Sequence, residues 1–453
     1  MTKISFCGIS GNGVSALAQI MAQKGFEVRG SDRAFDNNVD QDRKKALEDI
    51  GITIYPQDGS AITDDLDTLY VSTAVEDSIP DVKAAKEKNI PIKTRPELLA
   101  ELFHQYPRNI AVSGTSGKTT TTAMVGYILD VLGHKPCTIN GGFMQNYADR
   151  KGIPNIIYNE GDICVIEADE SNGSIEKYHP YIGLINNIGL DHKSLDELKQ
   201  LFVNFADRCK YGLVINADCE LCKDIRSSCK NLTFSVENNK ADLFADNIKA
   251  VPDGTDYTID GRSFHLNLIG KFNVANALGA IGICMMLGID KFDAAKALEG
   301  FLGTQRRLEV VGTSKGITII DDFAHNPDKV RGSVSALRDY AGRLIVMFQP
   351  HGFAPMKMTG KGIMQAFASL LDKDDILVMP DIYFMGGTAD KSISSKDLID
   401  EALSLGVNAH YIPKREDVEK FILENAREGD RIIIMGARDN TLPEFSRKLL
   451  KEI

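Results

Sequence analysis

From residue 109 to residue 120 the chain reads Asn109-Ile110-Ala111-Val112-Ser113-Gly114-Thr115-Ser116-Gly117-Lys118-Thr119-Thr120. The apolar run predicts a buried strand, and the glycine-rich loop after it opens a helical pattern. Such a loop points backbone N–H groups and a helix N-terminus at phosphate, while Lys118 supplies a positive charge and Thr119 a hydroxyl for Mg²⁺. The loop predicts a nucleoside triphosphate site, with an ordinary glycine turn as the alternative. Its two glycines are closer together than in the usual G-x-x-x-x-G-K-[ST] pattern.

Acidic and imidazole side chains follow this loop along the chain. Glu167 ends the apolar run 163–167, and His192 comes 25 residues later. Groups of this kind at strand ends beside a phosphate loop suit Mg²⁺ that bridges a transferred phosphoryl group and its acceptor. A solvated strand-end carboxylate for Glu167 and a structural role for His192 are the alternatives.

The strand-and-helix pattern restarts twice, and this sets the expected domain boundaries. At about 150 residues per domain, a chain of 453 residues predicts about three domains. Strand candidates lead each part, at 3–8, at 109–113 and at 316–322. The run 69–75 predicts a further strand of the first part, and the apolar runs 163–167, 182–185 and 212–215 suit a largely parallel sheet covered on both faces. The stretch 230–267 predicts shorter strands with turns. We expect α/β domains at 1–106, 107–305 and 306–453.

Composition and charge exclude several classes of protein. The net charge of -11 argues against a nucleic-acid binder with a broad basic face. No apolar run approaches the roughly 20 residues that cross a bilayer, and the first residues lack a signal-peptide pattern, so we expect a cytoplasmic protein without a membrane partner. The eight cysteines suit reduced thiols, and Cys219, Cys222 and Cys229 lack a fourth ligand at zinc-site spacing.

The first domain carries a second glycine-rich loop. Gly11, Gly13 and Ala16 fit a dinucleotide fingerprint, and Asp32 lies where a ribose-binding acid would sit. An NAD-linked oxidoreductase is therefore a rival hypothesis, but it leaves the loop at Lys118 and Glu167 unexplained.

Taken together, the motifs resemble those of the Mur ligases, ATP-dependent ligases that build the peptide of peptidoglycan precursors. The resemblance covers essentially the whole chain and rests on the loop at Gly114, Glu167-Ala-Asp-Glu-Ser171, Asp191-His192, Gly270-Lys-Phe-Asn273-Val-Ala-Asn276, Arg306-Arg307 and Asp321-Asp-Phe-Ala-His325. The N-terminal Gly8-x-x-Gly11-x-Gly13-x-Ser15 is similar to the branch that joins L-alanine to UDP-N-acetylmuramate. The resemblance implies a Rossmann-like N-terminal domain for the UDP-sugar, a central P-loop ATPase domain and a Rossmann-like C-terminal domain for an amino acid or short peptide.

The resemblance also implies a mechanism, a set of ligands and a site. ATP phosphorylates a substrate carboxylate, and an amine then attacks the acyl phosphate. The implied ATP-binding residues are Gly114, Thr115, Ser116, Gly117, Lys118, Thr119, Thr120, Asn273, Asn276, Arg306, Arg307, Asp322 and His325. The UDP-sugar would be bound by Gly11, Asn12, Gly13, Ser15, Asp32, Ser72 and Thr73, and the amino acid by His351, Lys357 and Arg438. The implied catalytic residues are Lys118, Glu167, His192 and His351, with Mg²⁺ on Thr119, Glu167 and His192. A monomer or homodimer is expected.

The chain departs from this branch in ways that bear on the incoming amine. Ser116 stands where the branch has His, and Phe323 where it has Tyr. The residues after His351 lack the Arg-Tyr-Thr-Arg run of the branch, although arginine is the natural bidentate partner of a carboxylate. Met356-Lys357-Met358 is instead similar to the related ligase that recycles a tripeptide onto UDP-N-acetylmuramate, so that activity stays an alternative, as does a non-catalytic relative that binds UDP-sugar and nucleotide.

Overall fold

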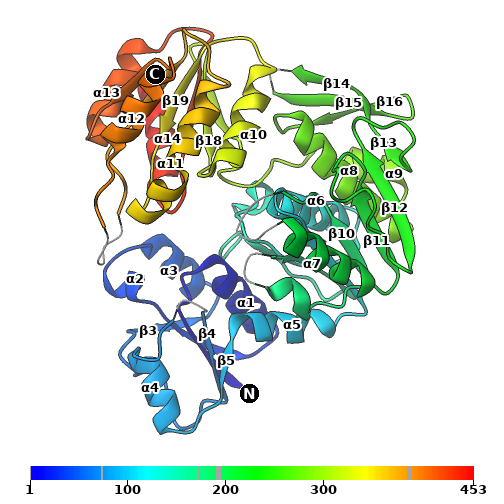
Figure 1. Ribbon diagram of the computed structural model, residues 1–453. Coiled ribbons are helices and arrows are strands. Elements are labelled where there is room, and N and C mark those ends of the chain that lie inside the picture. The colour runs from blue at the N-terminus through cyan, green and yellow to red at the C-terminus, as the bar shows by residue number, and fades with distance from the viewer. Residues whose placement is uncertain (1, 73–74, 171–172, 190–194, 252, 385–389) are drawn as a thin grey trace. The chain divides into compact units, whose positions relative to one another are not determined.

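The computed structural model describes residues 2–72, 75–170, 173–189, 195–251, 253–384 and 390–453 (Figure 1). The predictions for Thr73 and His192 therefore lie outside the described residues. The chain forms two compact units: Met1–Ile248, Asp256–Asn267 and Phe272–Thr304 make up the first, and Lys249–Thr255, Leu268–Lys271 and Gln305–Ile453 the second. Within the described ranges, no helix has both the length and the apolar character to span a membrane.

A five-stranded parallel sheet begins the first unit, with the order β3-β2-β1-β4-β5. Its strands are β1 (Lys3–Cys7), β2 (Glu27–Ser31), β3 (Thr53–Tyr55), β4 (Thr68–Val71) and β5 (Ile92–Thr94), and the helices around it are α1 (Asn12–Gln23), α2 (Arg33–Asp36), α3 (Gln41–Glu48), α4 (Pro80–Glu87) and α5 (Arg95–His104). The strand expected at 69–75 ends at Val71. The strand order reverses between β1 and β4, and ligands of open α/β sheets bind at such a point.

An eight-stranded sheet forms the rest of the first unit, in the order β13-β12-β11-β10-β6-β9-β7-β8, and only the β7–β8 pair is antiparallel. Its strands are β6 (Arg108–Ser113), β7 (Cys137–Ile139), β8 (Ile156–Ile157), β9 (Ile163–Ala168), β10 (Ile182–Ile185), β11 (Gly212–Asn216), β12 (Lys230–Ser235) and β13 (Leu243–Phe244). The accompanying helices are α6 (Lys118–Val131), η1 (Gln145–Tyr147), η2 (Ser174–Lys177), α7 (Leu195–Asp207), α8 (Lys271–Met286) and α9 (Lys291–Leu298). Each buried run expected in this part of the chain is a strand.

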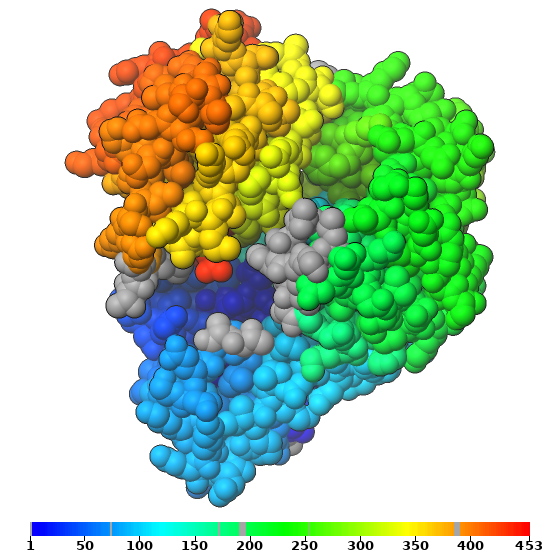
Figure 2. Space-filling model, viewed as in Figure 1, coloured from blue at the N-terminus to red at the C-terminus, as the bar shows by residue number. Residues whose placement is uncertain are grey.

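The two sheets of the first unit are joined by buried polar and aromatic contacts. The Gln19 amide on α1 donates to Asn155 Oδ1 at 2.8 Å, and its own oxygen accepts from the backbone N–H of Ile153 at 2.7 Å. The ring of Phe103 on α5 lies 5.4 Å from that of Tyr178, centroid to centroid. Figure 2 shows the light-blue surface of the first sheet region adjoining the green surface of the second. The two glycine-rich loops therefore belong to one packed body.

The second unit is a sheet with helices on both faces. The strand order is β17-β18-β22-β19-β20-β21, parallel except for β17–β18. Along β18, β19 and β22, successive residues alternate between two hydrophobic cores, as the two-residue period of a strand requires. The strands are β17 (Glu309–Ser314), β18 (Ile317–Asp322), β19 (Leu344–Phe348), β20 (Ile376–Met379), β21 (Ala409–Tyr411) and β22 (Arg431–Met435). The helices are α10 (Pro327–Arg338), α11 (Phe353–Ala368), α12 (Ser395–Ser404), α13 (Arg415–Asn425) and α14 (Leu442–Glu452).

A small three-stranded sheet completes the fold. Its order is β14-β15-β16, formed by β14 (Asp246–Val251), β15 (Gly254–Ile259) and β16 (Arg262–Leu266). The expectation of short strands and turns between 230 and 267 is confirmed.

Candidate active site

The phosphate loop connects β6 to α6 and depends on two glycines. Gly114 has φ +138° and Gly117 has φ +82°, conformations that side chains rarely adopt. A Cβ at Gly117 would lie 2.3 Å from Asn186 Nδ2 and 2.4 Å from Asn276 Oδ1, and one at Gly114 would lie 3.0 Å from the Asn186 Cβ. The loop is therefore packed so closely against its neighbours that only glycine fits at both positions.

Asparagines brace the loop from outside. After β10, Asn187 accepts from the Thr115 N–H through its carbonyl (3.0 Å) and from the Ser116 N–H through Oδ1 (2.8 Å). Asn186 Nδ2 donates to the Ser116 carbonyl (3.1 Å) and to Asn276 Oδ1 (2.7 Å). Sequence reasoning missed Asn186 and Asn187, although their position at the end of a strand beside β6 was the available signal.

The predicted asparagine pair lies on α8, where both residues are buried. Asn276 Nδ2 donates to Asn273 Oδ1 at 3.0 Å, and Asn276 in turn accepts from Asn186. In this structure the pair supports the phosphate loop, so its contact with adenine stays a prediction.

Lys118 begins α6, and its ammonium group lies between a carbonyl and two acids. Nζ donates to the Gly114 carbonyl and to Glu170 Oε2, both at 2.7 Å, and Asp169 Oδ1 lies at 3.9 Å. The Glu170 side chain is only 3% exposed. A buried carboxylate needs a partner of this kind, because an unpaired charge there is costly. The role of Glu170 was not foreseen, since the pairing depends on packing between β9 and α6.

Thr119 and Glu167 form the oxygen-rich part of the site. β9 is the neighbour of β6, and Glu167 lies opposite Val112 in the register. The Thr119 hydroxyl donates to Glu167 Oε2 at 3.0 Å, and Glu167 Oε1 accepts from the backbone N–H of Gly141 at 2.5 Å. Hydroxyl and carboxylate oxygens are the ligands that Mg²⁺ prefers, so this pair fits the ion. Among the described residues, which do not include His192, no group of three or more His, Cys, Asp or Glu is placed to hold a metal.

The glycine loop of the first sheet is connected to Glu167 by hydrogen bonds through Gly141. Asn12 at the start of α1 donates from Nδ2 to the Gly141 carbonyl at 2.9 Å. Gly141 thus accepts from Asn12 and donates to Glu167, which links the predicted UDP-sugar loop to the predicted metal ligand.

The other predicted UDP-sugar residues lie around that loop. Both Asp32 oxygens accept backbone N–H groups, one from Ser10 and one from Ala34, each at 2.9 Å. Ser72 follows β4 and its N–H donates to the Cys7 carbonyl. Ser15 is fully buried, and its hydroxyl donates to the Asn12 carbonyl at 3.1 Å. Asp32 and Ser15 shape the loop, and the exposed face of the loop is formed around Gly11.

In the second unit, His325, Arg438 and His351 follow the carboxyl ends of the adjacent strands β18, β22 and β19. The imidazole centroids of His325 and His351 are 5.6 Å apart. Burial lowers the pKa of His325 to about 4, and burial together with the charge of Arg438 lowers the pKa of His351. Both rings are neutral at pH 7.

Arg438 is exposed and has φ +61°, a left-handed conformation that is unfavourable for a residue with a side chain. Across the described residues, no acid lies within salt-bridge distance of its guanidinium, and His351 Nδ1 is buried without a hydrogen-bond partner. A guanidinium beside a neutral imidazole suits a carboxylate.

The remaining predicted residues of this unit make internal contacts. Arg306 is buried and donates to Asp321 and to the carbonyls of Gly436 and Asp439. Asp322 is buried and accepts from the backbone of Leu308 and Ala324 and from Ser333. The Arg307 guanidinium carbon lies 5.2 Å from the centroid of the Phe323 ring. Lys357 is exposed and paired with Asp390 at 2.8 Å.

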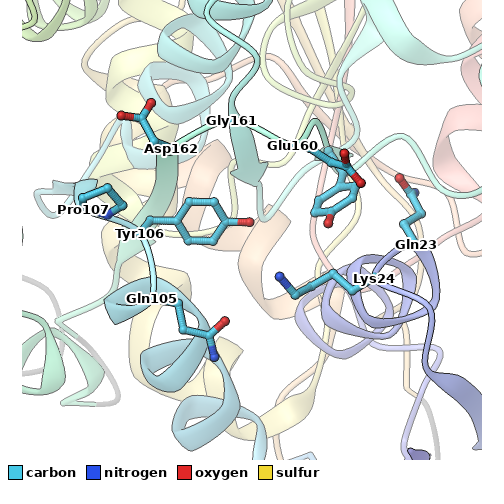
Figure 3. A pocket seen from close by; sticks show the side chains of 9 residues that line it. Gln23, Lys24, Gln105, Tyr106, Pro107, Glu160, Gly161 and Asp162 are labelled. Carbon is cyan, nitrogen blue, oxygen red and sulfur yellow. The ribbon is translucent and has the colours of Figure 1, made fainter. Parts of the chain in front are cut away.

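A pocket of about 570 Å³ lies elsewhere in the first unit (Figure 3). It is lined by Gln23, Lys24, Gln105, Tyr106, Pro107, Tyr158, Glu160, Gly161 and Asp162. Residues 105–107 precede β6 and residues 160–162 precede β9, so the pocket lies at the amino edge of these strands. The phosphate loop follows the carboxyl edge, and the pocket is therefore separate from it.

The sheets and the loop together define the class: an α/β protein with a P-loop at the carboxyl edge of a largely parallel sheet. Three family models match the chain, namely the Mur ligase family catalytic domain at residues 3–107, the Mur ligase middle domain at 112–284 and the Mur ligase glutamate ligase domain at 306–438. The chain belongs to the Mur ligase family.

Curated relatives and solved structures agree with this family. The UDP-N-acetylmuramate–L-alanine ligase of Agathobacter rectalis is 34% identical over 99% of this chain and 98% of its own, and that of Syntrophomonas wolfei is 33% identical over 96% and 94%. The crystal structure of UDP-N-acetylmuramate-alanine ligase from Thermotoga maritima superposes with a TM-score of 0.80 at 27% identity, covering 100% of this chain and 99% of that one. The predicted three-domain α/β fold and the predicted family are confirmed.

Proposed function

We propose that this Mur ligase joins L-alanine to the carboxylate of UDP-N-acetylmuramate, with ATP converted to ADP and phosphate, in the synthesis of peptidoglycan precursors. The observation that carries the proposal is the convergence of Lys118, Thr119 and Glu167 around the phosphate loop, in a chain that aligns over nearly its full length with L-alanine ligases. We place the UDP-sugar region at 1–106, the ATP region at 107–305 and the amino-acid region at 306–453, in a cytoplasmic enzyme.

The first half-reaction is a phosphoryl transfer. A carboxylate oxygen of UDP-N-acetylmuramate attacks the γ-phosphorus of ATP, ADP leaves, and an acyl phosphate results. The Lys118 ammonium and the positive end of the α6 dipole stabilise the charge that spreads over the phosphate oxygens. Mg²⁺ on Thr119, Glu167 and His192 would neutralise charge shared between the β- and γ-phosphates. To bind the phosphates, the Lys118 ammonium would have to leave its ion pair with Glu170.

The second half-reaction forms the amide. The free amine of the amino acid attacks the acyl carbon, the C–N bond forms, and phosphate leaves. We assign the carboxylate of the amino acid to Arg438, since Lys357 is already paired with Asp390. His351 is neutral at pH 7 and can accept the proton that the amine releases.

One observation favours a second candidate, the ligation of a whole tripeptide. The Arg-rich run that would follow His351 is missing, and α11 presents Met358 to solvent with 84% of its surface exposed. A larger acceptor would use such a surface.

A phosphate-release screen separates these candidates. Purified protein would be mixed with ATP, Mg²⁺ and UDP-N-acetylmuramate, and challenged with each amino acid and with the tripeptide. We expect the highest kcat/KM with L-alanine. A higher value for the tripeptide would replace the proposal with the recycling activity, and binding of UDP-sugar and ATP without release for any acceptor would indicate a non-catalytic relative. Hydride transfer from NADH would instead support the hypothesis of an NAD-linked oxidoreductase.

A further inference from the structure

Two cysteines lie on one turn after β11, next to the segment that braces the phosphate loop. The Cys219 carbonyl accepts from the N–H groups of Cys222 (2.9 Å) and Lys223 (3.0 Å). A turn of this kind brings residues three apart to within about 7 Å at Cα, and disulfides span about 4.4 to 6.8 Å. The spacing of the two residues on this turn is therefore compatible with a disulfide.

The two sulfurs are chemically unequal. Cys219 is half-buried, whereas Cys222 is fully buried. The Cys222 thiol and the backbone N–H groups of Ile188, Cys222 and Leu221 lower the pKa of Cys219 to about 6, and the interaction with Cys219 and burial raise the pKa of Cys222. At pH 7 Cys219 is therefore a thiolate that solvent can reach, which is the reactive form of the side chain.

The thiolate is connected to the phosphate loop by backbone hydrogen bonds. Its sulfur accepts from the Ile188 N–H at 3.3 Å. In the next residue, the Gly189 N–H donates to the Thr115 hydroxyl at 3.0 Å, and the preceding Asn187 accepts from the Thr115 N–H at 3.0 Å. The position of the sulfur thus helps to hold the segment 187–189 against the loop.

We propose that Cys219 and Cys222 form a thiol modification site, which a peroxide converts to a disulfide, and that this bond weakens ATP binding. The Cys219 thiolate attacks a peroxide oxygen, the O–O bond breaks, hydroxide leaves, and a sulfenic acid remains. The Cys222 sulfur then attacks the Cys219 sulfur, the S–S bond forms, and the sulfenic oxygen leaves as water with the Cys222 proton. Two electrons pass from the sulfurs to the peroxide, and a dithiol reductant reverses the change.

The disulfide removes the negative charge that attracts the Ile188 N–H. A disulfide sulfur is a weaker acceptor than a thiolate, so the support of segment 187–189 is reduced. The modification itself does not depend on the proposed function, but its effect on ATP rests on the P-loop part of that proposal.

The test uses the full chain, treated with hydrogen peroxide and then with iodoacetamide. Peptide mass spectrometry reports each thiol, and calorimetry reports the dissociation constant of ATP before and after treatment and after reduction with dithiothreitol. We expect the peptide spanning 219–222 to lose two hydrogens and to resist alkylation, and ATP binding to weaken about fivefold, the equivalent of one net hydrogen bond. Cys219→Ser and Cys222→Ala should abolish both effects, whereas Cys229→Ser, a change at another half-buried cysteine, should leave both in place.

Two results would overturn the proposal. If both thiols stay free while Cys229 is modified, the site does not exist. If the disulfide forms and the ATP dissociation constant is unchanged, the link to the phosphate loop is wrong. Untreated protein that fails to bind ATP at all would instead refute the P-loop assignment, so the two failures are distinguishable.

Discussion

Glu170→Gln tests whether the buried acid competes with ATP for Lys118. The pair is joined at 2.7 Å, with side chains 15% (Lys118) and 3% (Glu170) exposed. Breaking a buried pair costs about 3–5 kcal/mol. Because Lys118 keeps some solvent and has Asp169 at 3.9 Å, we expect a loss of about 2 kcal/mol in the free energy of unfolding. Without the Glu170 carboxylate, the phosphate oxygens lose their strongest competitor for the Lys118 ammonium, and ATP should bind about tenfold more tightly, which is about 1.4 kcal/mol.

Urea unfolding would measure the first effect, and calorimetry with a non-hydrolysable ATP analogue the second. Glu160→Gln is the matched control, because this exposed acid lies at the amino edge of the same sheet and should alter neither quantity. Weaker nucleotide binding by Glu170→Gln would refute the reasoning, since it would make Glu170 a support of the nucleotide site and not a competitor.

Four further predictions concern the other assigned residues. Lys118→Ala should reduce ATP-dependent phosphate release at least about 100-fold with an unchanged circular dichroism spectrum; normal release would remove the loop from the mechanism. Glu167→Ala should raise the Mg²⁺ concentration needed for half-maximal rate, and an unaltered Mg²⁺ titration would exclude Glu167 as a ligand. Arg438→Gly should raise the KM for the amino acid about tenfold while stabilising the fold by about 1 kcal/mol through relief of the positive φ; an unchanged KM would leave Arg438 without a role in binding. Burial lowers the pKa of His325 from 6.5 to about 4, so the unfolded chain binds more protons in that window and His325 reduces stability as pH falls through it. His325→Asn should therefore lose less stability than the parent chain between pH 7 and pH 4 in urea titrations, and equal losses would contradict the shift.

Local patterns were enough to predict the fold class. Apolar runs such as 163–167 and 182–185 are strands because parallel sheets buried on both faces require uninterrupted hydrophobic residues. The phosphate loop was predicted for the same reason, since its glycines, lysine and threonine are contiguous. Strand ends were predicted less accurately, because hydrophobicity alone does not report where strand pairing ends. The apolar run continues to Val75, for example, whereas β4 ends at Val71.

The hydrogen-bond partners of the site residues depend on tertiary packing and could not be predicted from the sequence. Nothing in the sequence pairs Lys118 with Glu170 across 52 positions, or turns Asn276 toward the loop through Asn186. The same holds for Asp322. The motif predicts it as an ATP-binding residue, whereas in the structure it is buried and accepts hydrogen bonds from the Leu308 N–H and the Ser333 hydroxyl. Motifs predict which residues gather at a site, whereas the hydrogen bonds that these residues make with their neighbours depend on the fold.

The backbone of Gly141 connects two loops through the peptide groups on either side of its Cα. Its carbonyl receives the amide of Asn12 and its nitrogen contacts Glu167. A sugar nucleotide that drew Asn12 toward itself would free the Gly141 carbonyl and change how firmly the backbone of Gly141 orients Glu167 before ATP binds. The order in which the two substrates bind would then depend on this residue, which must be glycine, because a Cβ there would lie 2.8 Å from the Glu167 oxygen.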